Sequence, residues 1–114
     1  QAQNTVERPP LGEHQFKSLI NQLKEQPFQK GQVLVLSRWV QQYQMTSQQV
    51  ATTLKMQRFQ SDRLEVLKLL AGSVSDTENI NMVLDVMRFR EERKAAERII
   101  FQRTQKNAPS IPQY

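Results

Sequence analysis

The sequence predicts an all-α fold, a short array of three stacked helical hairpins with six helices and a repeat of about 30 residues. The first observation behind this prediction is a phenylalanine that recurs at positions 28, 59 and 89. The second is that apolar residues recur at helical distances around each copy. Nine and five residues before it they are Leu19, Leu23, Val50, Leu54, Ile80 and Leu84; seven and eleven after it they are Val35, Trp39, Val66, Leu70, Ala96 and Ile100. A repeat of this length with helical periodicity is typical of stacked helix pairs.

Apolar stripes and breaking residues place the first predicted hairpin. A stripe at i, i+3, i+4 and i+7 predicts a helix over 13–26, which Pro27 ends. A broader apolar face predicts the second helix over about 30–44, and its breadth indicates contact with more than one neighbour. The stripe of the first helix consists of Phe16, Leu19, Ile20 and Leu23.

Two capping-box patterns place the later hairpins. Thr46-Ser47-Gln48-Gln49 predicts that the third helix begins after Thr46, and Ser75-Asp76-Thr77-Glu78 predicts the start of the fifth. We expect the fourth helix to begin near Ser61-Asp62 and to end near Gly72, since glycine is common after helix ends. The sixth is expected over about 90–104.

Each phenylalanine falls between the two helices of a hairpin. We expect its ring to be wedged between them, where it would set their crossing, and truncating a buried ring typically costs about 3–5 kcal/mol. The alternative is three unrelated core phenylalanines, which the matching flanks disfavour.

Composition divides the chain into a helical repeat domain, 13–104, between a flexible leader, 1–12, and a flexible tail, 105–114. Both ends are rich in proline and lack an apolar period, which is typical of mobile segments.

The longest apolar run, Val33 to Leu36, is far too short to span a membrane, so no membrane-spanning helix is expected. The chain starts with Gln1-Ala2-Gln3 instead of Met, as the residues after a signal-peptidase cut would. We therefore expect a mature product or a piece of a longer chain, with secretion one of two open possibilities.

One stretch carries a family resemblance. Residues 59–70, Phe-Gln-Ser-Asp-Arg-Leu-Glu-Val-Leu-Lys-Leu-Leu, resemble the motif of the family catalogued as domain of unknown function 4476. A weaker copy runs from Phe28 to Leu36, with Gly31 in place of the acidic cap, and a third departs further, with Lys94 where Leu64 stood. The resemblance covers about residues 14–100 and implies a helical fold. It brings no catalytic or binding residues, and because similar members are often exported bacterial proteins it favours a secreted or periplasmic location.

The residue types argue against catalysis, a cofactor or a metal site. The chain has no cysteine and one histidine, His14, which we expect to be exposed, so zinc and haem sites of the usual kinds are not supported. Acidic residues come in pairs that could serve acid–base catalysis, but each pair lies in the first turn of a predicted helix, where carboxylates favour the positive end of the dipole. The pairs are Asp62 with Glu65, Asp76 with Glu78, and Glu91 with Glu92. We therefore expect that the protein is not an enzyme.

The last predicted helix carries the candidate partner-binding residues: Arg90, Lys94 and Arg98 at i, i+4 and i+8, and Phe101 on the same outer side. The formal net charge of +5 favours an acidic partner, although such a charge also simply keeps a protein soluble. We expect a non-enzymatic module for protein or peptide recognition. The alternative is a nucleic-acid-binding module in which this basic face follows a phosphate backbone. A solvated face with an Arg93–Glu97 pair remains a third interpretation.

Overall fold

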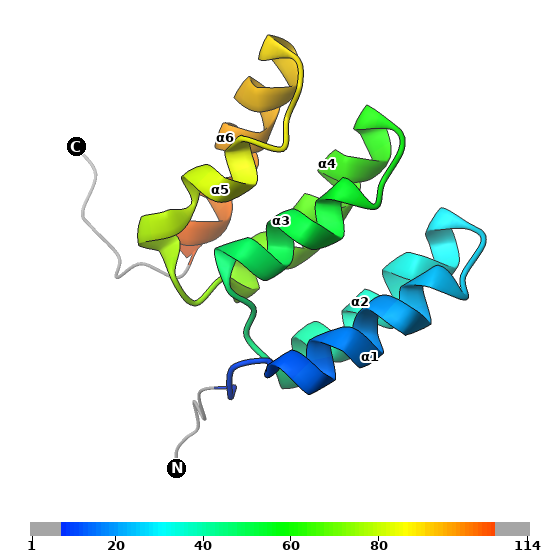
Figure 1. Cartoon of the computed structure of the whole chain (residues 1–114). Helices are drawn as coiled ribbons and strands as arrows, with labels where there is room; N and C mark the ends of the chain where they lie inside the picture. Colours follow the sequence, from blue (N-terminus) through cyan, green and yellow to red (C-terminus); the bar gives the residue numbers. More distant parts are fainter. Residues whose placement is uncertain (1–7, 107–114) are drawn as a thin grey trace.

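In the computed structural model the chain forms six α-helices, which pair as three hairpins (Figure 1). The structure describes residues 8–106, with side chains to residue 103. Hairpin 1 consists of α1 (Glu13–Lys24) and α2 (Gln29–Gln42), and hairpin 2 of α3 (Ser47–Lys55) and α4 (Gln60–Leu70). Hairpin 3 consists of α5 (Asn81–Leu84) and α6 (Arg90–Lys106). Two 3₁₀ turns, η1 (Ala71–Ser73) and η2 (Thr77–Asn79), lie between hairpins 2 and 3. The predicted all-α array of three hairpins is confirmed.

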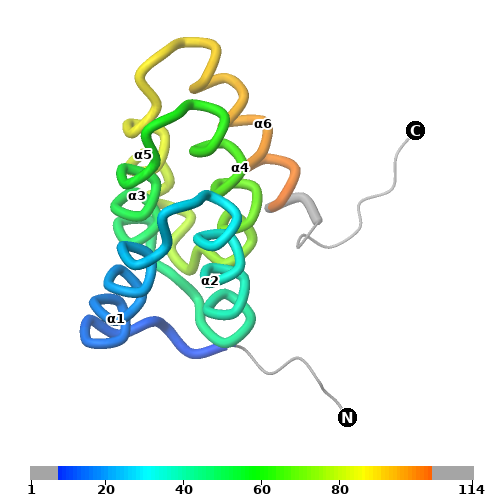
Figure 2. The backbone as a smooth tube through the Cα atoms, turned by 90° about the vertical axis from the view of Figure 1, so that its right-hand side faces the viewer, coloured from blue at the N-terminus to red at the C-terminus, as the bar shows by residue number. Residues whose placement is uncertain are grey.

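The hairpins stack side by side into two layers. The second helices form one layer, in which α4 lies between α2 and α6 and contacts both (Figure 2). The first helices form the other layer, in which α3 contacts α5. The tips of the three hairpins, where each first helix turns into the second, lie along one edge of the molecule (Figure 1). We call this edge, centred on residues 24–30, 55–62 and 85–91, the tip edge.

The core consists of the residues that flank each phenylalanine at helical distances. Of the twelve repeat positions that predict the array, eight are buried and four are partly buried against the core. The buried ones are Leu19, Leu23, Val50, Leu54, Val66, Leu70, Leu84 and Ala96. Since every hairpin exposes its apolar face until a neighbour covers it, stacking is what completes the core.

The phenylalanines themselves are not in the core, and the predicted wedge is wrong. Phe28, Phe59 and Phe89 are 74%, 65% and 59% exposed. The flanking positions face inward because they lie on helical stripes, whereas the phenylalanine lies in the turn between two helices and projects outward. The periodicity identified equivalent positions correctly but did not show which way they face.

A polar side chain four residues after each phenylalanine closes the hairpin instead. In hairpin 1 the Gln32 amide donates to the carbonyl oxygens of Leu23 and Gln26 at 3.4 and 3.3 Å. In hairpin 2 the Arg63 guanidinium donates to the carbonyl oxygens of Gln57 and Arg58 at 3.1 and 3.5 Å. In hairpin 3 Arg93 donates to the carbonyl oxygen of Leu84 at 3.2 Å. These bonds tie the second helix of each hairpin to carbonyl groups at the end of the first helix or in the turn that follows it.

The segments that enter the hairpins pair with one another at the opposite end of the array. Isolated parallel bridges join Pro10 to Gln44 and Met45 to Val74. Leu11 is buried, and Arg8 donates to the hydroxyl of Ser73 at 3.2 Å. Residues 8–12, placed in the leader by the sequence, are therefore attached to the hairpins. Residues 1–7 and 107–114 of the predicted leader and tail lie outside the described residues, so their flexibility stays a prediction.

The fifth helix is shorter than predicted, and its capping box is wrong. The hydroxyl of Ser75, the predicted cap, donates instead to the Met45 carbonyl at 3.4 Å. The Asp76 carboxylate accepts from the Ser47 amide of hairpin 2 at 2.6 Å, and the Asp76 carbonyl accepts from the Ser47 hydroxyl at 3.0 Å. The segment that follows forms the 3₁₀ turn η2 before α5 begins. The box at Thr46 and Gln49 is confirmed, with both hydrogen bonds formed. None of the described helices combines the length and apolarity needed to cross a membrane.

Exposure of the tip rings predicts small effects of their removal on stability. Phe28→Ala, Phe59→Ala and Phe89→Ala should each lower the free energy of unfolding by less than about 1 kcal/mol, as surface substitutions usually do. Leu54→Ala, which removes a fully buried side chain five residues before Phe59, should cost about 2–5 kcal/mol. Urea denaturation followed by circular dichroism measures both. If each phenylalanine variant instead lowered the free energy of unfolding by about 3 kcal/mol or more, the cost of truncating a buried ring, the rings would be wedged between the helices after all.

Asp76 predicts an acid-dependent part of the stability. Partial burial would raise the pKa of its carboxyl, but hydrogen bonds from Asn79 and Ser47 outweigh this and hold the pKa below its usual value. Its contribution is therefore complete above the unfolded-state pKa of about 3.9 and is lost as pH falls through the lower folded-state value. Asp76→Asn should flatten the fall in stability below about pH 4, whereas Glu78→Gln, at an exposed neighbour, should not. Urea titrations at several pH values compare the slopes, and equal slopes for wild type and Asp76→Asn would contradict the assignment.

Candidate functional site

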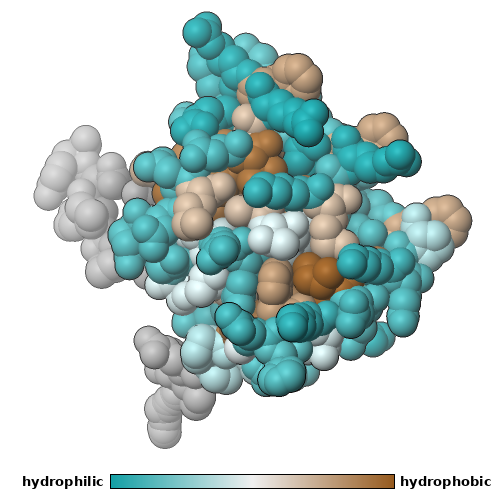
Figure 3. All heavy atoms as spheres, viewed as in Figure 1, coloured by the Kyte–Doolittle hydropathy of each residue, from teal (hydrophilic) through white to brown (hydrophobic). Residues whose placement is uncertain are grey.

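Three aromatic rings stand in solvent along the tip edge, one from each hairpin. They are the exposed Phe28, Phe59 and Phe89. Figure 3 shows pale-brown apolar groups standing out separately along the edge where the hairpin tips lie, between hydrophilic side chains. Burying a phenylalanine is worth about 1.5–3 kcal/mol relative to leaving it in water, and the fold forgoes this three times. Single exposed apolar residues are common, but three at equivalent positions on one edge form a pattern.

The local structure gives the rings no role in starting the helices. Phe28 and Phe59 are the N-cap residues of α2 and α4, and neither side chain forms a capping hydrogen bond. Phe89 immediately precedes α6. Ser, Thr, Asp or Asn at an N-cap would typically stabilise a helix by about 0.5–2 kcal/mol more than an apolar residue. The rings are therefore disfavoured both by their exposure and by their position.

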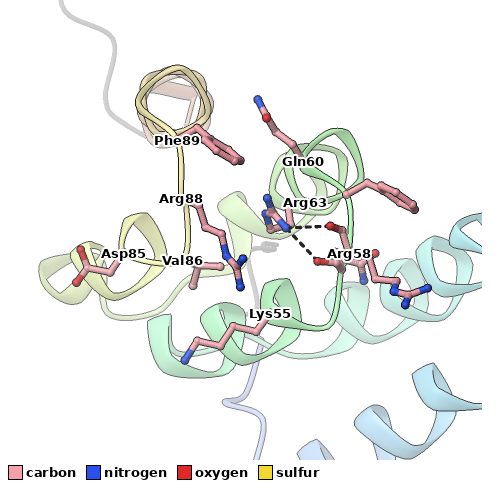
Figure 4. A pocket seen from close by; sticks show the side chains of 10 residues that line it. Lys55, Arg58, Gln60, Arg63, Asp85, Val86, Arg88 and Phe89 are labelled. Atoms are coloured by element: carbon pink, nitrogen blue, oxygen red, sulfur yellow. Dashed lines mark hydrogen bonds between the residues drawn. The ribbon is translucent and has the colours of Figure 1, made fainter.

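Two grooves run between neighbouring tips. The first groove lies between hairpins 1 and 2, has a volume of about 260 Å³ and is lined by both Phe28 and Phe59. The second groove lies between hairpins 2 and 3, has a volume of about 750 Å³ and is lined by both Phe59 and Phe89. Figure 4 shows the second groove, with the Phe89 ring directed from hairpin 3 toward Gln60 at the start of α4. Each groove is thus walled by the rings of two hairpins, and Phe59 belongs to both.

The second groove carries an excess of positive charge. Lys55, Arg58 and Arg88 line it, all three are exposed, and none has a carboxylate within 4 Å among the described residues. Figure 4 shows that they come from the end of α3 and from the two turns. The one carboxylate in the lining, Asp85, pairs with Arg93 at 3.3 Å. Three unpaired cations therefore share one hollow with two aromatic rings.

A buried ion pair forms the floor of the second groove. Arg63 of α4 meets Glu92 of α6 in a two-pronged pair, with Nε to Oε2 at 2.5 Å and Nη2 to Oε1 at 3.1 Å. Side-chain exposure is 9% for Arg63 and zero for Glu92. The bond to Glu92 raises the pKa of the Arg63 guanidinium above its already high value, more than partial burial lowers it. The Arg63 charge is therefore neutralised within the fold and leaves the groove charge to the three exposed cations.

The first groove is neutral by comparison. Its lining contains one base, Arg58, and one acid, Asp62. Its floor is crossed by a neutral hydrogen bond from the Gln57 amide to the Gln32 side-chain oxygen at 2.8 Å. The two grooves share the Phe59 ring but differ in charge.

The structure places the predicted partner-binding residues on the outer face of α6. Arg90, Lys94 and Arg98 are exposed, and Phe101 is 62% exposed. Lys94, Arg98 and Phe101 line a common hollow of about 570 Å³ together with Glu97, while Arg90 does not line it. The predicted Arg93–Glu97 pair is present at 3.9 Å. This face is therefore a second, separate basic surface that also contains a carboxylate.

Two of the predicted helix-capping carboxylates have other partners. Glu92 lies in the first turn of α6 as predicted, but its carboxylate binds Arg63 of hairpin 2. The Asp76 carboxylate accepts from the backbone amide of Ser47, at the start of α3 in hairpin 2. No three His, Asp or Glu side chains in the described part of the chain are close enough to hold a metal ion.

The tip edge was missed by sequence reasoning, although a signal was present. Each phenylalanine directly precedes a predicted helix, where an apolar residue neither caps the helix nor belongs to its buried stripe. In the second and third copies an arginine, Arg58 or Arg88, stands just before it. Arg63 and Glu92 gave no such signal, because they are 29 residues apart and only the stacking of hairpins 2 and 3 brings them together.

The comparisons with known proteins concern most of the chain. The family model described as Domain of unknown function (DUF4476) matches residues 10–100, which include all three tip phenylalanines and end one residue before Phe101. Separate searches of the curated proteins and of the solved structures returned no match.

The Arg63–Glu92 pair predicts an asymmetric response to substitution. Glu92→Ala should lower the free energy of unfolding by about 3–5 kcal/mol, because it leaves the Arg63 charge buried without its partner. Replacing both residues by Met should recover only part of this loss, since no buried charge remains but the Gln57 and Arg58 carbonyl groups lose their bonds from Arg63. Asp85→Asn, which breaks the exposed pair with Arg93, should cost less than about 1 kcal/mol. Urea denaturation measures the three effects, and a Glu92→Ala variant as stable as wild type would show that the pair does not hold the tips together.

Proposed function

The chain belongs to the DUF4476 family, which carries no assigned activity, and from the geometry of its own residues we propose a non-enzymatic module that binds a protein or peptide partner along the tip edge. The observation that carries the proposal is the row of three exposed rings at equivalent positions, one for each hairpin. Neither core packing nor helix capping accounts for them. Aromatic residues and arginine are the residue types enriched where proteins bind other proteins.

The arrangement of the rings supports a partner that contacts several hairpins at once. Arrays of stacked hairpins present extended surfaces with equivalent positions side by side. Phe59 stands between Phe28 and Phe89 and lines both grooves, so one partner segment lying across the edge would contact all three rings. Covering rings that already stand in water recovers the burial energy that the isolated domain forgoes.

The lining of the grooves supports binding without catalysis. The two grooves are lined by phenylalanine, arginine, lysine, glutamine and a few apolar residues, with the carboxylates of Asp62 and Asp85. A general base, a nucleophile and an orienting group within hydrogen-bond reach of one another are the usual requirement for acyl or phosphoryl chemistry. Neither lining contains histidine, serine, threonine or tyrosine.

The second candidate function is nucleic-acid binding by the outer face of α6. The exposure of Arg90, Lys94 and Arg98 favours it, and so does the hollow that Lys94 and Arg98 share with an aromatic ring. Glu97 in the same hollow disfavours it, because a carboxylate repels a phosphate backbone. We therefore place this candidate second.

Partner capture with matched variants tests the proposal. Immobilised wild-type protein is exposed to extract and culture medium of the native source, with and without nuclease, and bound proteins are quantified by mass spectrometry. The triple variant Phe28→Ala/Phe59→Ala/Phe89→Ala should lose the partner, because fully burying a phenylalanine is worth about 1.5–3 kcal/mol and the variant removes three such rings. The control variant Leu34→Ala/Met82→Ala, which trims two other exposed apolar residues, should retain it.

The outcomes separate the two candidates. Equal capture by wild type and the triple variant would overturn binding at the tip edge. Loss of all bound material after nuclease, with a gel shift of nucleic acid at about 50 mM salt that Arg90→Ala/Lys94→Ala/Arg98→Ala abolishes, would favour the α6 candidate. Circular dichroism of each variant confirms that it is folded.

A further inference from the structure

The charge of the second groove and the spacing of its rings point to the chemistry of the partner: we propose that the tip edge binds an extended acidic peptide segment. Its carboxylates would lie over the second groove and its apolar side chains against the phenylalanine rings. This inference rests on the proposed function, because it names the kind of partner that the same edge would take.

The second groove offers positive charge that an acidic partner would complement. Lys55, Arg58 and Arg88 share the second groove, and within the described residues no carboxylate comes within 4 Å of any of them. Two carboxylates at the groove already have partners: Glu92 binds Arg63, and Asp85 binds Arg93. The groove therefore has cations without counter-charges, and an acidic side chain from a partner would supply them.

The arginines of the second groove stand beside the phenylalanine rings. Arg58 and Arg88 occupy the same place in successive repeats, one residue before Phe59 and Phe89. Arg58 lines both grooves and Arg88 lines the second groove, so each arginine shares a groove with a tip ring. Since a guanidinium can donate two parallel hydrogen bonds to one carboxylate, such a row suits Asp or Glu between apolar contacts.

The spacing of the rings limits where apolar side chains of a partner can stand. Packed helices lie about 8–10 Å apart, and a chain in the extended polyproline II conformation advances about 3.1 Å for each residue, with every third side chain on the same face. Adjacent rings of the tip edge are therefore about three residues of extended peptide apart. The segment that fits carries an apolar residue at every third position, with acidic residues between those that contact Phe59 and Phe89.

Two observations favour a peptide over a single-stranded nucleic acid. The tip edge also carries carboxylates, Asp62 in the first groove and Asp85 in the second, whereas grooves that follow a phosphate backbone are consistently basic. The first groove is close to neutral, so the positive charge is confined to one part of the edge. A short acidic segment matches a local charge, and a polyanion does not.

Defined peptides test the inference. The probe is a fluorescein-labelled peptide with Leu at every third position and Glu between, measured by fluorescence anisotropy at about 50 mM salt, where exposed charges are weakly screened. One comparison peptide has Gln in place of Glu, and another has Ser in place of Leu. Both should bind more weakly, the Gln peptide by about five- to ten-fold, as expected for the loss of a few exposed charge pairs.

Matched variants locate the binding. Arg58→Gln/Arg88→Gln should weaken the Glu peptide by about five- to ten-fold and leave the Gln peptide unchanged. The bond from Arg63 to the Arg58 carbonyl involves the backbone, so this substitution does not remove it. Phe59→Ala/Phe89→Ala should weaken both peptides. Lys17→Gln/Lys68→Gln removes the same net charge at exposed positions of α1 and α4 away from the tips and should change neither.

Each other outcome overturns the inference. Equal binding of the Glu and Gln peptides, or equal effects of the two charge variants, would show that the charge of the groove does not select the ligand. Absence of binding of the Glu peptide would also contradict the proposal that the tip edge binds an acidic segment. Capture of a partner that depends on the three phenylalanines would in that case still support the proposed function. If an oligothymidylate or phosphatidylserine vesicles bound more tightly than the Glu peptide, and this binding required Phe59 and Phe89, the ligand of the tip edge would be a nucleic acid or a membrane surface and not an acidic peptide.

Discussion

The closing of each hairpin by a polar side chain is the interaction on which the rest of the structure depends. Gln32, Arg63 and Arg93, each four residues after a phenylalanine, donate to carbonyl groups at the end of the preceding helix or in the turn that follows it. Because this contact turns the chain from one helix into the next, no apolar wedge is needed in the turn. The phenylalanine is therefore not required in the core, and its ring lies exposed to solvent at the tip of each hairpin.

Contacts between hairpins use the same turns. Arg63 closes hairpin 2 and also binds Glu92 of hairpin 3, and Gln57 of hairpin 2 binds the Gln32 side chain of hairpin 1. At the opposite end Asp76 holds the α3 amide, and the entering segments pair through Met45 and Val74. The array is therefore tied at both ends by polar contacts, while the apolar flanks of the repeat fill the space between the layers. Breaking one of these buried contacts costs more than removing a surface side chain, because it leaves a polar group without a partner.

Rigid turns explain how three exposed rings can form one surface. Each ring is attached to a backbone that the neighbouring helix ends and the closing side chain hold in place, so its position relative to the next ring is set by helix packing. A binding surface that is already ordered loses less conformational entropy when a partner arrives. The same turns place arginines beside two of the rings, so apolar and charged contacts are available within one groove.

The sequence by itself determined the local features of this protein: the six helices, most of their ends, the apolar stripes that face the core, the capping box at Thr46 and the ion pair between Arg93 and Glu97. These depend on residues within a few positions of one another, and helical periodicity reports them directly. Only the tertiary structure decided which way the phenylalanines face, that Arg63 meets Glu92 and that Asp76 binds Ser47. The physical reason is that a repeat establishes which positions are equivalent, whereas contacts between residues about 30 positions apart exist only once neighbouring hairpins have stacked.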